Sequence, residues 1–206
     1  VYVGNLKLSA PSDGTIYNEI YGSRYVGGVI GRVNALSVYD SQTEKVIVGV
    51  KEGSESDYYN PTDTSTEDGG YVGGLIGYTD ALVSNDSLVD NRVNAKDVIA
   101  RGDHTVGGVV GRAVNINYQR AENVTVDSIA KSGGICGISD GTINYCRVKD
   151  STIRAKTTSG DNGGVVAGGI SGYSYNISNS YTLNSNVTAN QYAGGICGIA
   201  GSYARS

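Results

Sequence analysis

The chain has 206 residues and a formal net charge of −4, with 16 Lys and Arg against 20 Asp and Glu. The chain has no cluster of basic residues that could bind a phosphate backbone, so we predict no nucleic-acid partner. No apolar run reaches the roughly 20 residues of a membrane helix, so we predict no membrane insertion within this chain. Phe, Trp and Met are absent while Gly contributes 31 residues, so the core is expected to consist of thin layers of Val, Ile, Leu and Ala.

One glycine-containing frame recurs along the chain and reads aliphatic or small, Gly, Gly, aliphatic, small or aliphatic, Gly. Its glycines are Gly27, Gly28, Gly31, Gly73, Gly74, Gly77, Gly107, Gly108, Gly111, Gly133, Gly134, Gly137, Gly168, Gly169, Gly172, Gly194, Gly195 and Gly198. Successive copies are 46, 34, 26, 35 and 26 residues apart. These intervals indicate a repeat unit of about 26 residues with insertions, a period typical of solenoids.

The repeat predicts a single domain over residues 1–206, with residues 1–24 as a partial first unit. Two insertions are expected to protrude as loops: an acidic one at 51–68 and a smaller one at 156–166. Residues 194–206 begin with another copy of the frame but lack the later strands of a unit, so we expect them to form an incomplete last unit.

Within a unit, short runs with apolar residues at alternate positions are separated by Gly, Asn, Asp and Ser, which is typical of short strands and tight turns. We predict an all-β chain with about three short strands per unit of about 26 residues. Because one such unit cannot bury its apolar face alone, we expect about six units to stack as a β-solenoid, similar to a parallel β-helix.

The first glycine of each frame is a common reference point for the strands of neighbouring units. Nine residues after that glycine stand Leu36, Leu82, Ile116 and Ile177, with Ile143 one place later. We predict that these residues form one column of the second strand. The Gly-Gly pair is expected at a corner where a positive φ or a close backbone approach is needed, and the following glycine at the next bend.

The cysteines and the histidine predict no disulfide, metal site or cofactor. Cys136 and Cys197 share a repeat position, with Ser171 between them, which places their backbones roughly 9–10 Å apart for a stacking distance of about 4.8 Å and beyond the reach of a disulfide. We interpret both as small inward hydrophobes. His104 is the single histidine, and no cysteine pair has the spacing of metal ligands.

Tyrosine supplies every aromatic side chain and gives the candidate ligand-binding residues. Tyr25 and Tyr71 occupy one position before the glycine pair, and Tyr78 and Tyr173 occupy one position after it. The candidates in the acidic insertion are Tyr58 and Tyr59. Such ladders suit stacking on a sugar or a protein partner; the alternative is that they pack against one another.

An enzyme is the remote alternative, since two carboxylates on neighbouring units can act as a glycosidase pair. Asp40 and Asp86 both stand thirteen residues after the first glycine of their frames. The opposing interpretation is that they are turn residues at a strand end, and the sequence therefore predicts a protein without catalytic activity.

The frame resembles the GLUG repeat of large bacterial cell-surface proteins, which include adhesin-like proteins and the non-catalytic part of some immunoglobulin A peptidases. The resemblance is carried by Tyr71–Tyr78 and Gly133–Cys146 and extends from about Tyr25 onward. It implies an extracellular bacterial β-solenoid that serves adhesion, spacing or display, with a host-surface glycan or protein as partner and without catalytic residues.

The alternative function is a self-assembling extracellular filament, in which identical subunits stack end to end. It follows from the partial first and last units, whose open strand edges offer a contact that propagates without closing.

Overall fold

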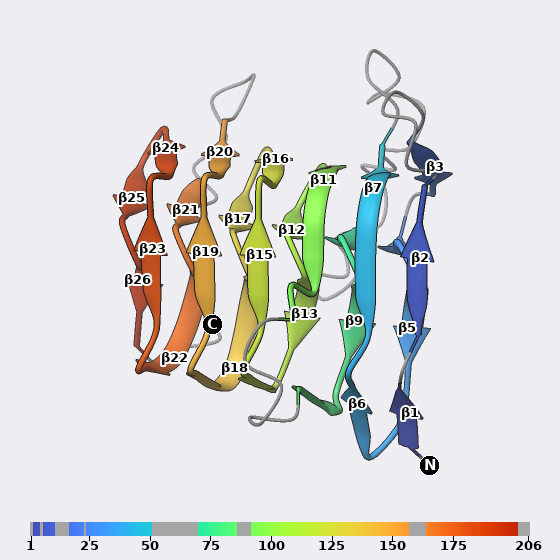
Figure 1. The fold of residues 1–206 in the computed structure, drawn as a ribbon. Helices are drawn as coiled ribbons and strands as arrows, with labels where there is room; N and C mark the ends of the chain where they lie inside the picture. Colours follow the sequence, from blue (N-terminus) through green and yellow to red (C-terminus); the bar gives the residue numbers. More distant parts are fainter. Residues whose placement is uncertain are drawn as a thin grey trace.

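The computed structural model describes residues 2–4, 6–10, 17–22, 24–50, 70–85, 92–156 and 164–201. Within these ranges the chain forms 26 strands and no helix, and each strand pairing is parallel. Figure 1 shows strands of successive units side by side, from the blue amino-terminal strands to the red carboxyl-terminal ones. The predicted all-β class is confirmed.

The smallest sheet, sheet C, contains the strands that lead into the Gly-Gly pairs. Its strands are β4 (Tyr25–Gly27), β8 (Tyr71–Gly73), β12 (Thr105–Gly107), β17 (Lys131–Gly133), β21 (Val166–Gly168) and β25 (Tyr192–Gly194). In each pairing the first glycines of two frames stand opposite each other, as Gly107 does to Gly133. The alignment of the frames made from sequence therefore matches the register of this sheet.

Sheet A follows the glycine pairs and contains ten strands within the described ranges. They are β1 (Tyr2–Gly4), β5 (Ile30–Val33), β6 (Ser37–Tyr39), β9 (Ile76–Thr79), β10 (Leu82–Ser84), β13 (Val110–Ala113), β14 (Asn115–Asn117), β18 (Cys136–Asn144), β22 (Ser171–Ser178) and β26 (Cys197–Ala200). β13 and β14 pair with different parts of β18, so sheet A consists of two rows of short strands that the long strands β18 and β22 join.

Sheet B closes the unit and also contains ten strands within the described ranges. They are β2 (Lys7–Ser9), β3 (Asn18–Tyr21), β7 (Gln42–Gly49), β11 (Ala95–Gly102), β15 (Arg120–Glu122), β16 (Thr125–Ser128), β19 (Arg147–Lys149), β20 (Thr152–Ala155), β23 (Tyr181–Leu183) and β24 (Asn186–Ala189). β15 and β16 both pair with β11, so this sheet is likewise divided into two rows.

The number of strands per unit differs from the prediction. A unit without insertions, such as β12 to β16, has five short strands in three sheets, where about three strands were expected. The additional break in sheet B lies at residues with positive φ, such as Asn123 between β15 and β16, whereas no described non-glycine residue with positive φ lies at the break in sheet A. All nine described non-glycine residues of this kind lie at the bend between sheets A and B or at the bend within sheet B.

The repeat glycines allow close backbone approach and do not adopt positive φ. None of them is among the glycines with positive φ. A Cβ built on Gly107 would lie 1.9 Å from the Val110 carbonyl oxygen, and one built on Gly108 would lie 2.2 Å from the Gly134 carbonyl oxygen. At Gly107 and Gly108 the pair therefore makes a tight bend between sheets C and A that leaves no space for a side chain.

The third glycine of each frame lies inside a strand, which corrects the prediction that it makes a bend. Gly111 is the second residue of β13, and a Cβ there would lie 2.4 Å from the Gly77 oxygen and 2.8 Å from the Val72 nitrogen. Its role is to let sheet A pack directly against the backbone of sheet C.

The core consists of aliphatic columns that run across the units, and one of them differs from the predicted column. The pairings place Val38, Val83, Ile116, Ile143 and Ile177 in line. Leu36 is 66% exposed and Leu82 stands opposite Ser37 and Asn115, so both were wrongly assigned. The bend between the two rows of sheet A varies in length from unit to unit, which shifts the count from the glycine.

The three cysteines are free. Cys136 and Cys197 each stand opposite Ser171, as predicted, and Cys136 and Cys146 are buried in the core. Burial raises the pKa of both buried thiols, that of Cys146 to about 12, so they act as small core side chains.

Candidate binding surface

Three of the predicted tyrosines come together between sheets C and A. Tyr25 and Tyr71 are opposite residues of β4 and β8, and their rings stack with centroids 5.9 Å apart. Tyr78 of β9 contacts both rings, at 5.5 Å and 5.4 Å. The juxtaposition of Tyr25 and Tyr71 was predicted, whereas the contact of Tyr78 from sheet A with both rings was not.

Arginines contact this cluster, in which Tyr71 is buried and Tyr25 and Tyr78 are half-buried. Arg112 donates from Nη1 to the Tyr71 hydroxyl at 3.0 Å and from Nε to Asp140 at 2.7 Å. Tyr71 is only 4% exposed. Burial, followed by a hydrogen bond to Asp80, raises the pKa of Tyr78 to about 12. The rings stack on one another and on guanidinium groups, which leaves little ring face for a ligand.

Tyr173 lies apart from that cluster. It shares the column of Tyr78, with Arg112 and Ile138 between them, as the spacing predicted. Its side chain is 3% exposed, its ring contacts Tyr175 edge to face, and its hydroxyl donates to the Gly201 carbonyl. Tyr173 therefore packs within the fold.

The remaining predicted residues lie elsewhere. Tyr58, Tyr59 and Asp86 lie outside the described residues, as do all of the insertion at 51–68 and residues 157–163 of the smaller one. Asp40 follows β6 with a φ of 50° and forms an ion pair with Arg92 at 3.1 Å, so it occupies a turn position.

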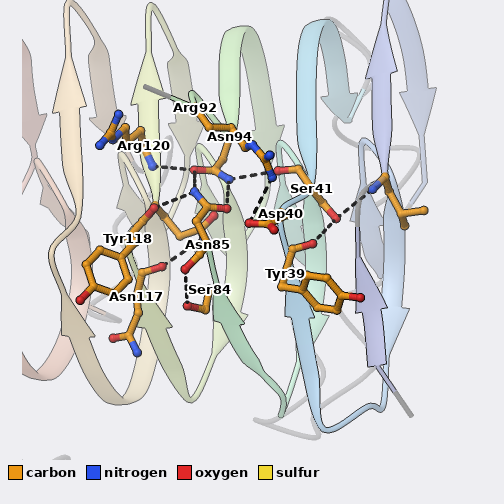
Figure 2. A network of polar contacts seen from close by, with 12 residues as sticks. Tyr39, Asp40, Ser41, Ser84, Asn85, Arg92, Asn94, Asn117, Tyr118 and Arg120 are labelled. Carbon is orange, nitrogen blue, oxygen red and sulfur yellow. Dashed lines mark hydrogen bonds and ion pairs between the residues drawn. The ribbon is translucent and has the colours of Figure 1, made fainter. Parts of the chain in front are cut away.

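Asp40 borders a buried polar network at the bend between sheets A and B (Figure 2). Asn85 and Asn94 exchange two hydrogen bonds of 2.8 Å. The amide of Asn94 also donates to the Ser41 carbonyl at 3.0 Å and accepts from the Arg120 backbone at 2.9 Å. Asn94 is completely buried, so this network fastens three units together at the bend.

The most exposed aromatic feature of this bend is one that the sequence analysis missed. Tyr118 and Tyr145 follow β14 and β18, and their rings stack in parallel with centroids 5.0 Å apart and an interplanar angle of 2°. Tyr145 is 47% exposed. Figure 2 shows Tyr118 beside Asn117 at the same bend. The sequence signal was the dipeptide Asn-Tyr, present at 117–118 and again at 144–145.

Both tyrosines adopt a backbone conformation that is unfavourable for their residue type. Their φ values are 54° and 52°, and the residues with positive φ at the same bend in other units are Asp40 and Asn179, which tolerate it better. The left-handed conformation costs roughly 1–2 kcal/mol for an ordinary side chain, and a stacked aromatic pair contributes about 0.5–1.5 kcal/mol. The stack therefore does not offset the backbone cost of both tyrosines, so fold stability alone does not account for this pair.

Neutral polar side chains lie next to the two rings on sheet A. The outward residues of β14 and of the ends of β18 and β22 are Asn115, Asn117, Thr142, Asn144, Asn176 and Ser178. Asn144 Oδ1 accepts from Ser178 Oγ and from Asn179 Nδ2, each at 2.9 Å. We call these six residues, together with Tyr118, Tyr145 and Asn179, the amide–tyrosine face.

Comparison with protein-family models, curated proteins and solved structures found no match. The resemblance to the GLUG repeat therefore stays a prediction. In the described part of the chain, no group of three or more His, Cys, Asp and Glu side chains is arranged to hold a metal ion, and no helix there has the length and apolarity to cross a membrane.

Proposed function

We propose that the chain is a β-solenoid whose units each pass once through sheets C, A and B. The parallel pairing of equivalent strands and the aligned frame glycines support this proposal. The division of sheets A and B into two rows each would give the solenoid five short strands per turn.

We further propose that this solenoid is a non-enzymatic structural and adhesive part of a bacterial surface protein, which holds a binding surface for a host glycan or protein. The observation that carries the proposal is the Tyr118–Tyr145 stack, an exposed aromatic pair on a regular scaffold. Exposed aromatic residues provide large contact area with few rotatable bonds. The likeness of the frame to the GLUG repeat supports the extracellular location.

The test is to incubate the purified chain with host cells and extracellular matrix and to measure retention, while light scattering and electron microscopy follow its mass over a concentration series. We expect a monomer that is retained, with the urea-unfolded chain as a control. Fibres without retention would contradict adhesion and support the filament alternative. Release of reducing ends from polysaccharides would contradict the non-enzymatic role.

A further inference from the structure

We propose that the amide–tyrosine face binds an uncharged glycan chain that lies across the units, parallel to the direction in which they stack. This inference rests on the proposed display function and names the ligand class of the same surface. It follows from the charge, the repetition and the backbone conformation of the face.

The face has no charged side chain among its nine members. The outward side of sheet B is different, because ion pairs join neighbouring strands there: Lys96 to Glu44 at 3.2 Å and Lys149 to Glu122 at 3.3 Å. Amides donate and accept hydrogen bonds, and phenols do the same, which matches the hydroxyl groups of a sugar. An uncharged ligand needs no oppositely charged side chain on this face.

The polar groups of the face also repeat at the strand spacing. Asn117, Asn144 and Ser178 stand opposite one another in successive units, and so do Thr142 and Asn176. Neighbouring strands lie about 4.8 Å apart, so equivalent donors and acceptors recur in a line. A chain of similar sugar units meets such a line with similar contacts along its length.

The backbone conformation of the two tyrosines is unfavourable for the fold. Asn at either bend position would tolerate the positive φ of 54° or 52° better than Tyr, and Asn179 occupies the same position with a φ of 49° in the next unit. A residue that is unfavourable for the backbone and exposed to solvent points to a role in binding. The parallel rings of Tyr118 and Tyr145 give a sugar an aromatic surface next to the amides.

The experiment titrates the full chain, by calorimetry, with neutral oligosaccharides of β-linked glucose, mannose, xylose and N-acetylglucosamine, and with oligogalacturonate and a heparin fragment as acidic probes. We expect at least one neutral probe to bind, with an affinity that changes less than about twofold between low and high salt, because no ion pair is screened. The double variant Tyr118→Asn/Tyr145→Asn should bind at least about tenfold more weakly, yet unfold at the same or a higher temperature.

The matched control is Tyr192→Asn, because Tyr192 is 55% exposed on sheet C and its loss should leave binding unchanged. Binding of acidic probes alone, unchanged binding by the double variant, or the absence of binding by every neutral probe would overturn this inference. If the chain is still retained on host cells in any of these cases, the display function stands. Its ligand is then a protein or an acidic glycan where no neutral probe binds, and a neutral glycan on another surface where the double variant binds unchanged. Loss of both cell retention and probe binding would overturn the proposed function as well.

Discussion

In five of the six frames, a carbonyl oxygen of the next unit leaves no room for a side chain at the second glycine. A Cβ on Gly108 would lie 2.2 Å from the Gly134 oxygen, whereas a Cβ on Gly195, at the same repeat position, meets nothing within 4 Å. We expect Gly108→Ala to lower the free energy of unfolding by about 3 kcal/mol or more and Gly195→Ala to change it by less than about 0.5 kcal/mol. Urea unfolding of both variants measures the difference, and equal effects would refute the steric explanation.

His104 makes the stability depend on pH. Burial, followed by the charge of Lys131, lowers its pKa from 6.5 to about 4, and its ring contacts the Thr105 hydroxyl at 2.9 Å. Because the unfolded chain binds the proton first, the stabilisation from the neutral ring is present above pH 6.5 and is lost as the pH falls towards 4. The loss should reach up to about 3 kcal/mol. The unfolding free energy, measured by urea unfolding at several pH values in this range, should change less with pH in His104→Gln than in the unmodified chain. The same pH dependence in both proteins would contradict this account.

At the scale of elements, the bend between β10 and β11 depends on one buried amide (Figure 2). Asn94 Nδ2 donates to the Ser41 carbonyl and to Asn85 Oδ1, so in Asn94→Asp an acceptor replaces that donor and a charge is buried. The expected cost is about 2–4 kcal/mol of unfolding free energy, measured by thermal unfolding. Asn190→Asp is the matched control because Asn190 is exposed, and a similar loss in both variants would refute the role of the network.

At the scale of elements, the apolar periodicity of the sequence predicts strands correctly but not always their register. Stretches of alternating apolar residues, such as those in β7, β19 and β20, lie together in sheet B. The column assigned through Leu36 and Leu82 was wrong, because the bend before it varies in length and a one-residue shift turns a strand's side chains to the other face. Alternation of apolar and polar residues identifies a strand, but its register against the neighbouring strands also depends on the length of the preceding bend.

At the scale of the whole molecule, the cysteines report on global unfolding. Cys136 and Cys146 are completely or almost completely buried, whereas Cys197 is partly exposed. Burial raises the pKa of all three thiols, so we expect slow labelling of Cys197 alone in the native protein, and of the other two only when the chain unfolds. Mass spectrometry after labelling in increasing urea tests this, with Cys197→Ser as the control. Early labelling of Cys146 would show that the middle units open separately.

By itself the sequence determined the all-β class, the pairing partners in sheet C and the free state of Cys136 and Cys197, because each depends on residue types that recur at a fixed distance from the glycines. It also placed Tyr25 next to Tyr71. Only the tertiary structure decided which tyrosines are accessible: Tyr71 is covered by Arg112 from another sheet, while Tyr145 stands at an outer bend, stacked only on Tyr118. Burial depends on what the other sheets place above a side chain, and that is not encoded in the residues next to it.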